Sequence, residues 1–187
     1  SSFETTFLST KPATGQVYEF SPPKNRDAGV SAKVGAVCAG SNPVIVALKN
    51  YGLDTLRSSS IAWSVATNGG GAVAQTNASW SGTLLRGDTV HVNLGSFNFQ
   101  TGNNYNIVAY SFNPNNQTDE NQANDTLLLL NYQTGMSGTY TIGGSAPDYS
   151  NFTNAVSDLE ARGVCGAVTF DVRYAAYNEQ ISIGSIS

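Results

Sequence analysis

The chain is 187 residues long, has a formal net charge of -4, and contains only 12% Asp, Glu, Lys and Arg. An average soluble domain has about 25% of such residues, so neutral polar side chains are expected to cover most of the surface. The nine Lys and Arg residues form no basic stripe, which argues against nucleic acid as a partner. The longest apolar run, Leu127 to Leu130, is far shorter than the roughly 20 residues of a membrane span, so no span is expected.

Residues 1–24 are predicted to be a linker or the tail of a preceding module. They contain three prolines, Pro12, Pro22 and Pro23, and two short apolar clusters. The chain starts without Met and ends inside a strand-like pattern. We therefore expect it to be a processed product or an excerpt of a longer protein.

Residues 25–134 are predicted to form a seven-stranded immunoglobulin-like antiparallel β-sandwich. Apolar and polar residues alternate in several segments, which is typical of strands with one buried face. Trp63 lies on the third predicted strand, the position of the core tryptophan in such sandwiches. The predicted strands are Val30–Val37, Val44–Lys49, Ile61–Thr67, Ala72–Trp80, Thr89–Phe99, Tyr105–Phe112 and Thr126–Tyr132.

Residues 135–187 are predicted to form a small strand-helix-strand-strand unit. Apolar residues recur at helical spacing from Ser150 to Arg162, with Ser150 as the expected N-cap and Gly163 after the C-terminus. The expected strands of this unit are Thr139–Ile142, Ala167–Arg173 and Tyr177–Ile183. The whole chain is therefore predicted to be mainly β.

Two family resemblances concern these regions. The segments DAGV from Asp27, VIVALKNYG from Val44, IAWSV from Ile61 and TDENQANDT from Thr118 resemble CARDB-like adhesive modules of bacterial surface proteins. The segment from Ser137 to Ile183 resembles the start of right-handed parallel β-helix domains in large secreted proteins of Bacteroidota. In that family the helix caps the N-terminal end of the β-helix, as an open solenoid end requires.

The resemblances imply a non-catalytic structural or adhesive segment of a large surface protein exported by type IX secretion. The implied location is extracellular or at the outer cell surface. The expected partners are other modules of the same polypeptide, neighbouring copies in a fibre, or surface glycans. Two alternatives stay open: an accessory module of a β-helix polysaccharide lyase or hydrolase, and a carbohydrate-binding module. Several tyrosines, including Tyr105 and Tyr110, are numerous enough for a sugar-binding platform, although most are expected in the core.

The sequence offers little support for catalysis. His91 is the only histidine and lies in an alternating strand pattern, which disfavours a histidine-based catalytic or metal site. Neighbouring carboxylates such as Asp158 and Glu160 do not establish the facing pair that glycoside hydrolysis needs. We therefore expect no enzyme activity in this chain.

The loop between residues 113 and 125 is a weak candidate for a Ca²⁺ site. It gathers the oxygen ligands that a hard cation prefers, but lacks the ordered spacing of known calcium loops. An Asx-rich turn, with side chains bonded to the backbone, is favoured instead. The candidate ligands are Asp119, Glu120, Asn121, Asn124 and Asp125.

Cys38 and Cys165 lie far apart and in different predicted domains. An interdomain disulfide is possible, but two unpaired buried thiols are favoured.

Three Asp-Thr-aliphatic triplets place Thr55, Thr89 and Thr126 in a pattern that resembles the O-glycosylation signal of secreted Bacteroidota proteins. All three are expected at loops or strand starts, where a hydroxyl can face solvent. The alternative is that Asp-Thr is simply common at turns.

Overall fold

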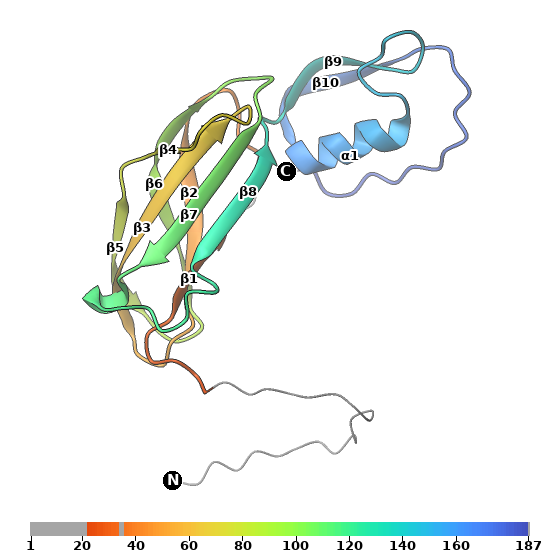
Figure 1. Cartoon of the computed structure of the whole chain (residues 1–187). Helices are drawn as coiled ribbons and strands as arrows, with labels where there is room; N and C mark the ends of the chain where they lie inside the picture. Colours follow the sequence, from red (N-terminus) through yellow and green to blue (C-terminus); the bar gives the residue numbers. More distant parts are fainter. Residues whose placement is uncertain (1–21, 34–35, 187) are drawn as a thin grey trace, which may run out of the picture.

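The computed structural model of the chain describes residues 22–33 and 36–186 (Figure 1). Most of the predicted linker, residues 1–21, lies outside the described residues. The elements in chain order are β1 (Ala28–Ala32), β2 (Gly40–Asn50), β3 (Leu56–Thr67), β4 (Val73–Ala74), β5 (Ala78–Leu84), β6 (Thr89–Phe99), β7 (Tyr105–Phe112), a 3-10 turn (Pro114–Asn116), β8 (Thr126–Tyr132), β9 (Met136–Ile142), α1 (Phe152–Arg162) and β10 (Val164–Val172).

Strands β1 to β8 form two packed sheets, which we call the sandwich. One sheet has the order β1-β2-β6, and the other has the order β4-β3-β7-β8, with β5 also paired to β3. All pairings in both sheets are antiparallel. Figure 1 shows β3, β7 and β8 in front of β2 and β6. The predicted immunoglobulin-like sandwich and its mainly β fold class are thereby confirmed.

The predicted strand Ala72–Trp80 was wrong as a single strand. The structure divides it into β4, which pairs with Ser64 and Val65, and β5, which pairs with the first half of β3. Between the two, the indole Nε1 of Trp63 donates to the carbonyl of Thr76 at 3.0 Å. The segment between β4 and β5 is therefore not paired with β3, and its Thr76 carbonyl supplies the acceptor that the buried indole needs.

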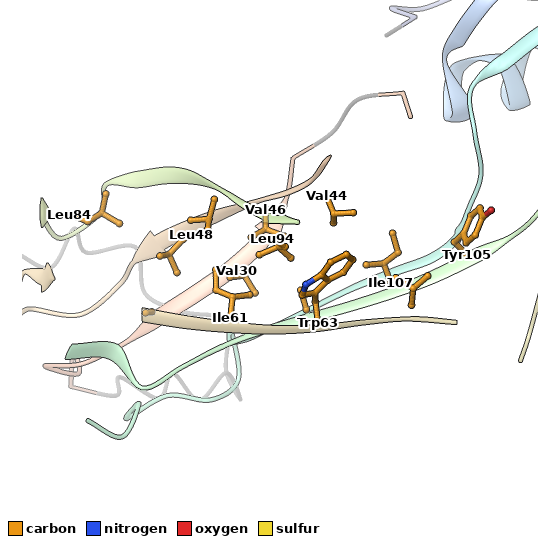
Figure 2. Close-up of a cluster of buried hydrophobic side chains, with 14 of the residues drawn as sticks. Val30, Val44, Val46, Leu48, Ile61, Trp63, Leu84, Leu94, Tyr105 and Ile107 are labelled. Carbon is orange, nitrogen blue, oxygen red and sulfur yellow. The ribbon is translucent and has the colours of Figure 1, made fainter. Parts of the chain in front are cut away.

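The core lies between the two sheets, as Figure 2 shows. Trp63 is 5% exposed and lies among the aliphatic side chains of both sheets. At one end, Phe97, Phe99 and Tyr105 meet edge to face with ring centroids 5.0 to 5.6 Å apart. The hydroxyl of Tyr105 accepts a hydrogen bond from the amide of Gln100 at 2.7 Å. This contact resembles the tyrosine corner of immunoglobulin-like folds, which fixes the loop before the strand.

The remaining elements, β9, α1 and β10 with residues 173–186, form a second body that we call the terminal unit. In Figure 1 it lies beyond one end of the sandwich. Strands β9 and β10 are parallel, and α1 is the connection between them. The buried helix residues Ala155, Val156 and Leu159 are accompanied by buried Met136 and Ile142 at the two ends of β9. The helix thus covers one side of the small sheet.

Two expectations for the terminal unit were wrong. The N-cap is Asn151, not Ser150, because the Asn151 side chain accepts from the amide of Asn154 at 2.8 Å. Residues Tyr177–Ile183 form no strand. The Glu179 carboxylate instead accepts from the amides of Phe152 and Thr153, two of the free donors at the start of α1. This segment is therefore held by side-chain contacts to the helix and not by a ladder.

Within the described residues, no helix combines the length and apolar character needed to cross a membrane.

Candidate functional site

The junction between the sandwich and the terminal unit contains a disulfide between Cys38 and Cys165, with Cα atoms 5.5 Å apart. Cys38 lies just before β2, and Cys165 lies in β10. The two unpaired thiols favoured from the sequence are therefore a wrong expectation. Separation along the chain gave no sign of the pairing, because the return of β10 beside β9 is what carries Cys165 back to the sandwich.

Hydrogen bonds surround this disulfide. The amide of Gly135 donates to the carbonyl of Val37 at 2.8 Å, and the Arg162 Nε donates to the carbonyl of Thr134 at 3.0 Å. A Cβ atom on Gly135 would lie 2.7 Å from the Cys165 sulfur, so only glycine fits there without a shift. Residues 134 to 136 are all buried. The connection between the two bodies is thus a packed joint and not an exposed linker.

The second candidate site is the acidic loop at the opposite end of β8, which is bonded to the start of β1. The Asp119 carboxylate accepts from the amides of Ala28 and Asn121, each at 2.8 Å. Glu120 forms an ion pair with Arg26, and its second oxygen accepts from the amide of Asn25 at 3.0 Å. The loop therefore fastens the beginning of β1 to the sheet that contains β7 and β8.

Asp27 was missed as a member of this cluster. It is 7% exposed and accepts from the side-chain amides of Asn121 at 3.0 Å and Asn124 at 2.7 Å. No local signal pointed to Asp27, because its partners Asn121 and Asn124 lie 94 and 97 residues later in the chain.

Asp125 is the unusual member of the cluster. It is 7% exposed, and its Oδ1 atom has no hydrogen-bond partner. Burial, followed by the charges of Asp119 and Asp27, raises the pKa of Asp125 to about 7. Burial also raises the pKa of Asp119, although its two backbone hydrogen bonds oppose the shift. The charge of Asp27 thus adds to the burial that disfavours the charged forms of Asp119 and Asp125.

The geometry favours the Asx-rich turn over a Ca²⁺ site. Ca²⁺ takes six to eight oxygen ligands, whereas both oxygens of Asp119 and of Asp27 already accept hydrogen bonds. Two buried oxygens of the loop, Asn124 Oδ1 and Asp125 Oδ1, have no partner. In residues 22–33 and 36–186, no three Asp, Glu, His or Cys side chains converge as a cation site.

The other candidate residues form no further cluster. His91 is exposed on the outward face of β6, opposite Ala47. Thr89 and Thr126 are exposed at the first positions of β6 and β8, while Thr55 is half-buried before β3. Their glycosylation remains a prediction. Asp158 bonds to Tyr149 and, at 2.9 Å, to Arg162, so its carboxylate lies in a helix-surface network.

Comparisons with known proteins give limited matches. The solution NMR structure of the CARDB domain of PF1109 from Pyrococcus furiosus is 22% identical, with a TM-score of 0.39; the match covers 57% of this chain and 93% of that chain. The crystal structure of the same domain in complex with di-metal ions is 21% identical, with a TM-score of 0.41, and the match covers 58% and 94%. Both are CARDB domains, the family that the sequence resembles, but a likeness of this size supplies no function. No family model matches the chain, and no curated protein is similar to it.

Proposed function

We propose that this chain is a non-catalytic structural and adhesive segment of a large extracellular bacterial surface protein. The observation that carries the proposal is the disulfide-bonded joint between the sandwich and the terminal unit. A packed joint with a covalent bond transmits force and fixes the direction in which the next module continues. A fixed joint of this kind suits a module that acts as a spacer or stalk.

The same disulfide supports an extracellular location. Disulfides persist in oxidising compartments and at cell surfaces, and are rare where glutathione keeps thiols reduced. The neutral polar composition, with 12% charged residues, is compatible with this location.

The parallel pairing of β9 and β10 supports the role of the terminal unit as the cap of a parallel β-helix. A parallel pair of this size buries too little to be stable alone, and α1 covers one side of it. Further parallel coils on the open edge of β10 would extend the sheet, with α1 closing the end of the solenoid.

Fibre assembly is a finer part of the proposal. It is supported by β8, which is the last strand in its sheet among the described residues, since an edge strand can pair with a further strand. The donor would be the segment 1–24 of a neighbouring copy. Deletion of residues 1–24 should then abolish polymers, and assembly that continues after the deletion would contradict this version.

The location is tested by labelling intact producing cells with a membrane-impermeant amine reagent. The chain offers an amine at the exposed Lys33, so labelling of intact cells is expected. Labelling that appears only after lysis, alongside a cytoplasmic control protein, would contradict the proposed location.

A further inference from the structure

The outward face of the sheet formed by β3, β7 and β8 has an unusual composition. Side chains alternate along each strand, so the buried residues Ile61, Trp63 and Val65 fix the outward positions between them. Apart from the exposed Arg57 at the irregularity near the start of β3, no outward position on these strands is Asp, Glu, Lys or Arg, whereas the outward face of the other sheet carries Lys49 and His91. The outward residues are Ser58, Ser60, Ala62, Ser64, Ala66, Asn106, Val108, Tyr110, Phe112, Thr126, Leu128 and Leu130.

Two shallow hollows follow one another along β3 on this face, and we call them together the β3 groove. The first has a volume of about 300 Å³ and is floored by Ala62 and Ser64. Its sides are Ala74 and Asn77 on one side and Val108 and Tyr110 on the other. The small floor residues leave this space open, because the larger side chains stand on the neighbouring strands.

The second hollow has a volume of about 210 Å³ and continues toward the start of β3. Its floor is formed by Ser58 and Ser60, which pair in register with Ser81 and Ser79 of β5. Asn113 and Asn116 of the turn after β7 close the other side. Four hydroxyls and two amides thus line one short stretch, each able both to donate and to accept hydrogen bonds.

An aromatic pair borders the same groove. Tyr110 lies opposite Ala62 in the ladder and is 46% exposed, so its ring is accessible beside the groove floor. The Phe112 ring lies 5.7 Å from that of Tyr110, and Phe112 pairs with Ser60. An accessible aromatic face beside hydroxyl and amide groups matches a pyranose ring, which has apolar C–H faces and a rim of hydroxyls.

We propose that the β3 groove binds a neutral linear oligosaccharide. One sugar ring stacks on Tyr110, and the next ring in the chain bonds through its hydroxyls to the serines and asparagines of the second hollow. The lining selects against anionic polymers, since these need several Lys or Arg to offset their charge. The residues that line the two hollows include neither, and the neighbouring Arg57 is bonded to the Thr83 hydroxyl of β5. The inference deepens the proposed function, because it rests on the adhesive role and names the ligand class.

A second protein chain is the competing occupant. Its contact would be centred on Leu128 and Leu130 of β8, which are 58% and 63% exposed and lie beyond Tyr110. The hydroxyl-lined hollows lie on the opposite side of β7, over β3 and β5. The open volume of the β3 groove and its hydrogen-bonding groups therefore lie over β3 and β5, away from the exposed leucines of β8.

The test uses the full chain in affinity electrophoresis against a β-glucan, a mannan, a xylan and an α-glucan as neutral polymers, with polygalacturonate and alginate as anionic ones. Retardation by at least one neutral polymer is expected, with none by the anionic polymers. The Tyr110→Ala variant should weaken this binding at least tenfold. Tyr174→Ala is the matched control, because Tyr174 is fully exposed in the terminal unit and should leave binding unchanged.

A second variant controls for a folding defect in Tyr110→Ala. Ser64→Gln fills the floor of the first hollow with a polar side chain and should also abolish binding, while the circular dichroism spectrum stays that of the parent.

Several results would overturn the inference: no binding to any neutral polymer, binding to anionic polymers alone, or full binding by both variants. Self-association that is lost in Leu128→Asn, with no sugar binding, would assign the face to a second copy. Cell-surface labelling is independent of these results, so the failure of sugar binding and the failure of the proposed location are distinguishable.

Discussion

Cys38 and Cys165 are bonded to each other across 127 residues of sequence, and the bond crosses from the sandwich to the terminal unit. The covalent link closes a loop that contains nearly all of the sandwich core. Its effect on stability is therefore expected to extend beyond the junction, because the unfolded chain loses the freedom of that whole loop.

The double variant Cys38→Ser/Cys165→Ser is expected to be less stable than the parent. For a loop of this length, the chain-entropy relation gives a loss of about 5 kcal/mol in the free energy of unfolding, as an upper figure. Urea denaturation followed by tryptophan fluorescence measures it. Reduced parent protein is the control and should unfold at the same urea concentration as the variant. A loss below about 1 kcal/mol would show that the bond adds little to the fold.

The buried acidic cluster predicts an unusual dependence of stability on pH. The pKa of Asp125 is about 7 in the folded protein and 3.8 in the unfolded reference. The folded state thus binds this proton more tightly, so the stabilisation is complete below about pH 4 and is lost as the pH rises through 7. The free energy of unfolding should fall by about 2 kcal/mol between pH 5 and pH 8.

Asp125→Asn removes the titrating group and should flatten this profile. At pH 8 the variant should be more stable than the parent, because the neutral amide avoids the buried charge beside Asp119 and Asp27. Asp54→Asn is the control, since Asp54 is exposed and lies outside the cluster. Parallel profiles for the parent and Asp125→Asn would contradict the assignment.

The same cluster decides the response to Ca²⁺. Since the oxygens of Asp119 and Asp27 accept hydrogen bonds from amides, millimolar Ca²⁺ at pH 8 should leave the midpoint of thermal unfolding unchanged. Differential scanning calorimetry with Ca²⁺ and with EDTA tests this. A rise with Ca²⁺ that disappears in Asp125→Asn would establish the cation site that the sequence offered as a weak candidate.

The sandwich could be predicted from the sequence, and the joint could not. Alternating residues around Trp63 define a face that must be buried, and this local pattern is enough to place a strand. The Cys38–Cys165 pair depends on how β10 returns beside β9, which no local pattern encodes. Residues Tyr177–Ile183 have a strand-like sequence, but their contacts to α1 and β9 replace a ladder.

In the acidic loop, likewise, contacts between residues close in sequence could be predicted, and contacts to residues far along the chain could not. Its composition predicted a loop whose side chains bond nearby groups, and the contact of Asp119 with Asn121 is of this kind. The partner groups Asp27 and Ala28 lie about 90 residues earlier and become neighbours only when β1 joins the sandwich. Burial is the main cause of the raised pKa of Asp125, followed by the charge of Asp119 in the same loop, and the distant Asp27 adds to both.

Tyr105→Phe is expected to lower the free energy of unfolding by about 1 kcal/mol, because the Gln100 amide loses its acceptor while the ring packing remains. Tyr110→Phe is the matched control, since the Tyr110 hydroxyl lies on the exposed face. Urea unfolding of the two variants measures the difference. Equal stability of the two would indicate that the tyrosine corner adds nothing to the loop.

The most direct test of the central claim is non-reducing peptide mapping, with intact mass, of the chain isolated from its own cells. A disulfide-joined extracellular segment predicts a linked pair of peptides that contain Cys38 and Cys165, separable only after reduction. Two free, alkylatable thiols in freshly isolated protein would contradict both the covalent joint and the extracellular location that rests on it.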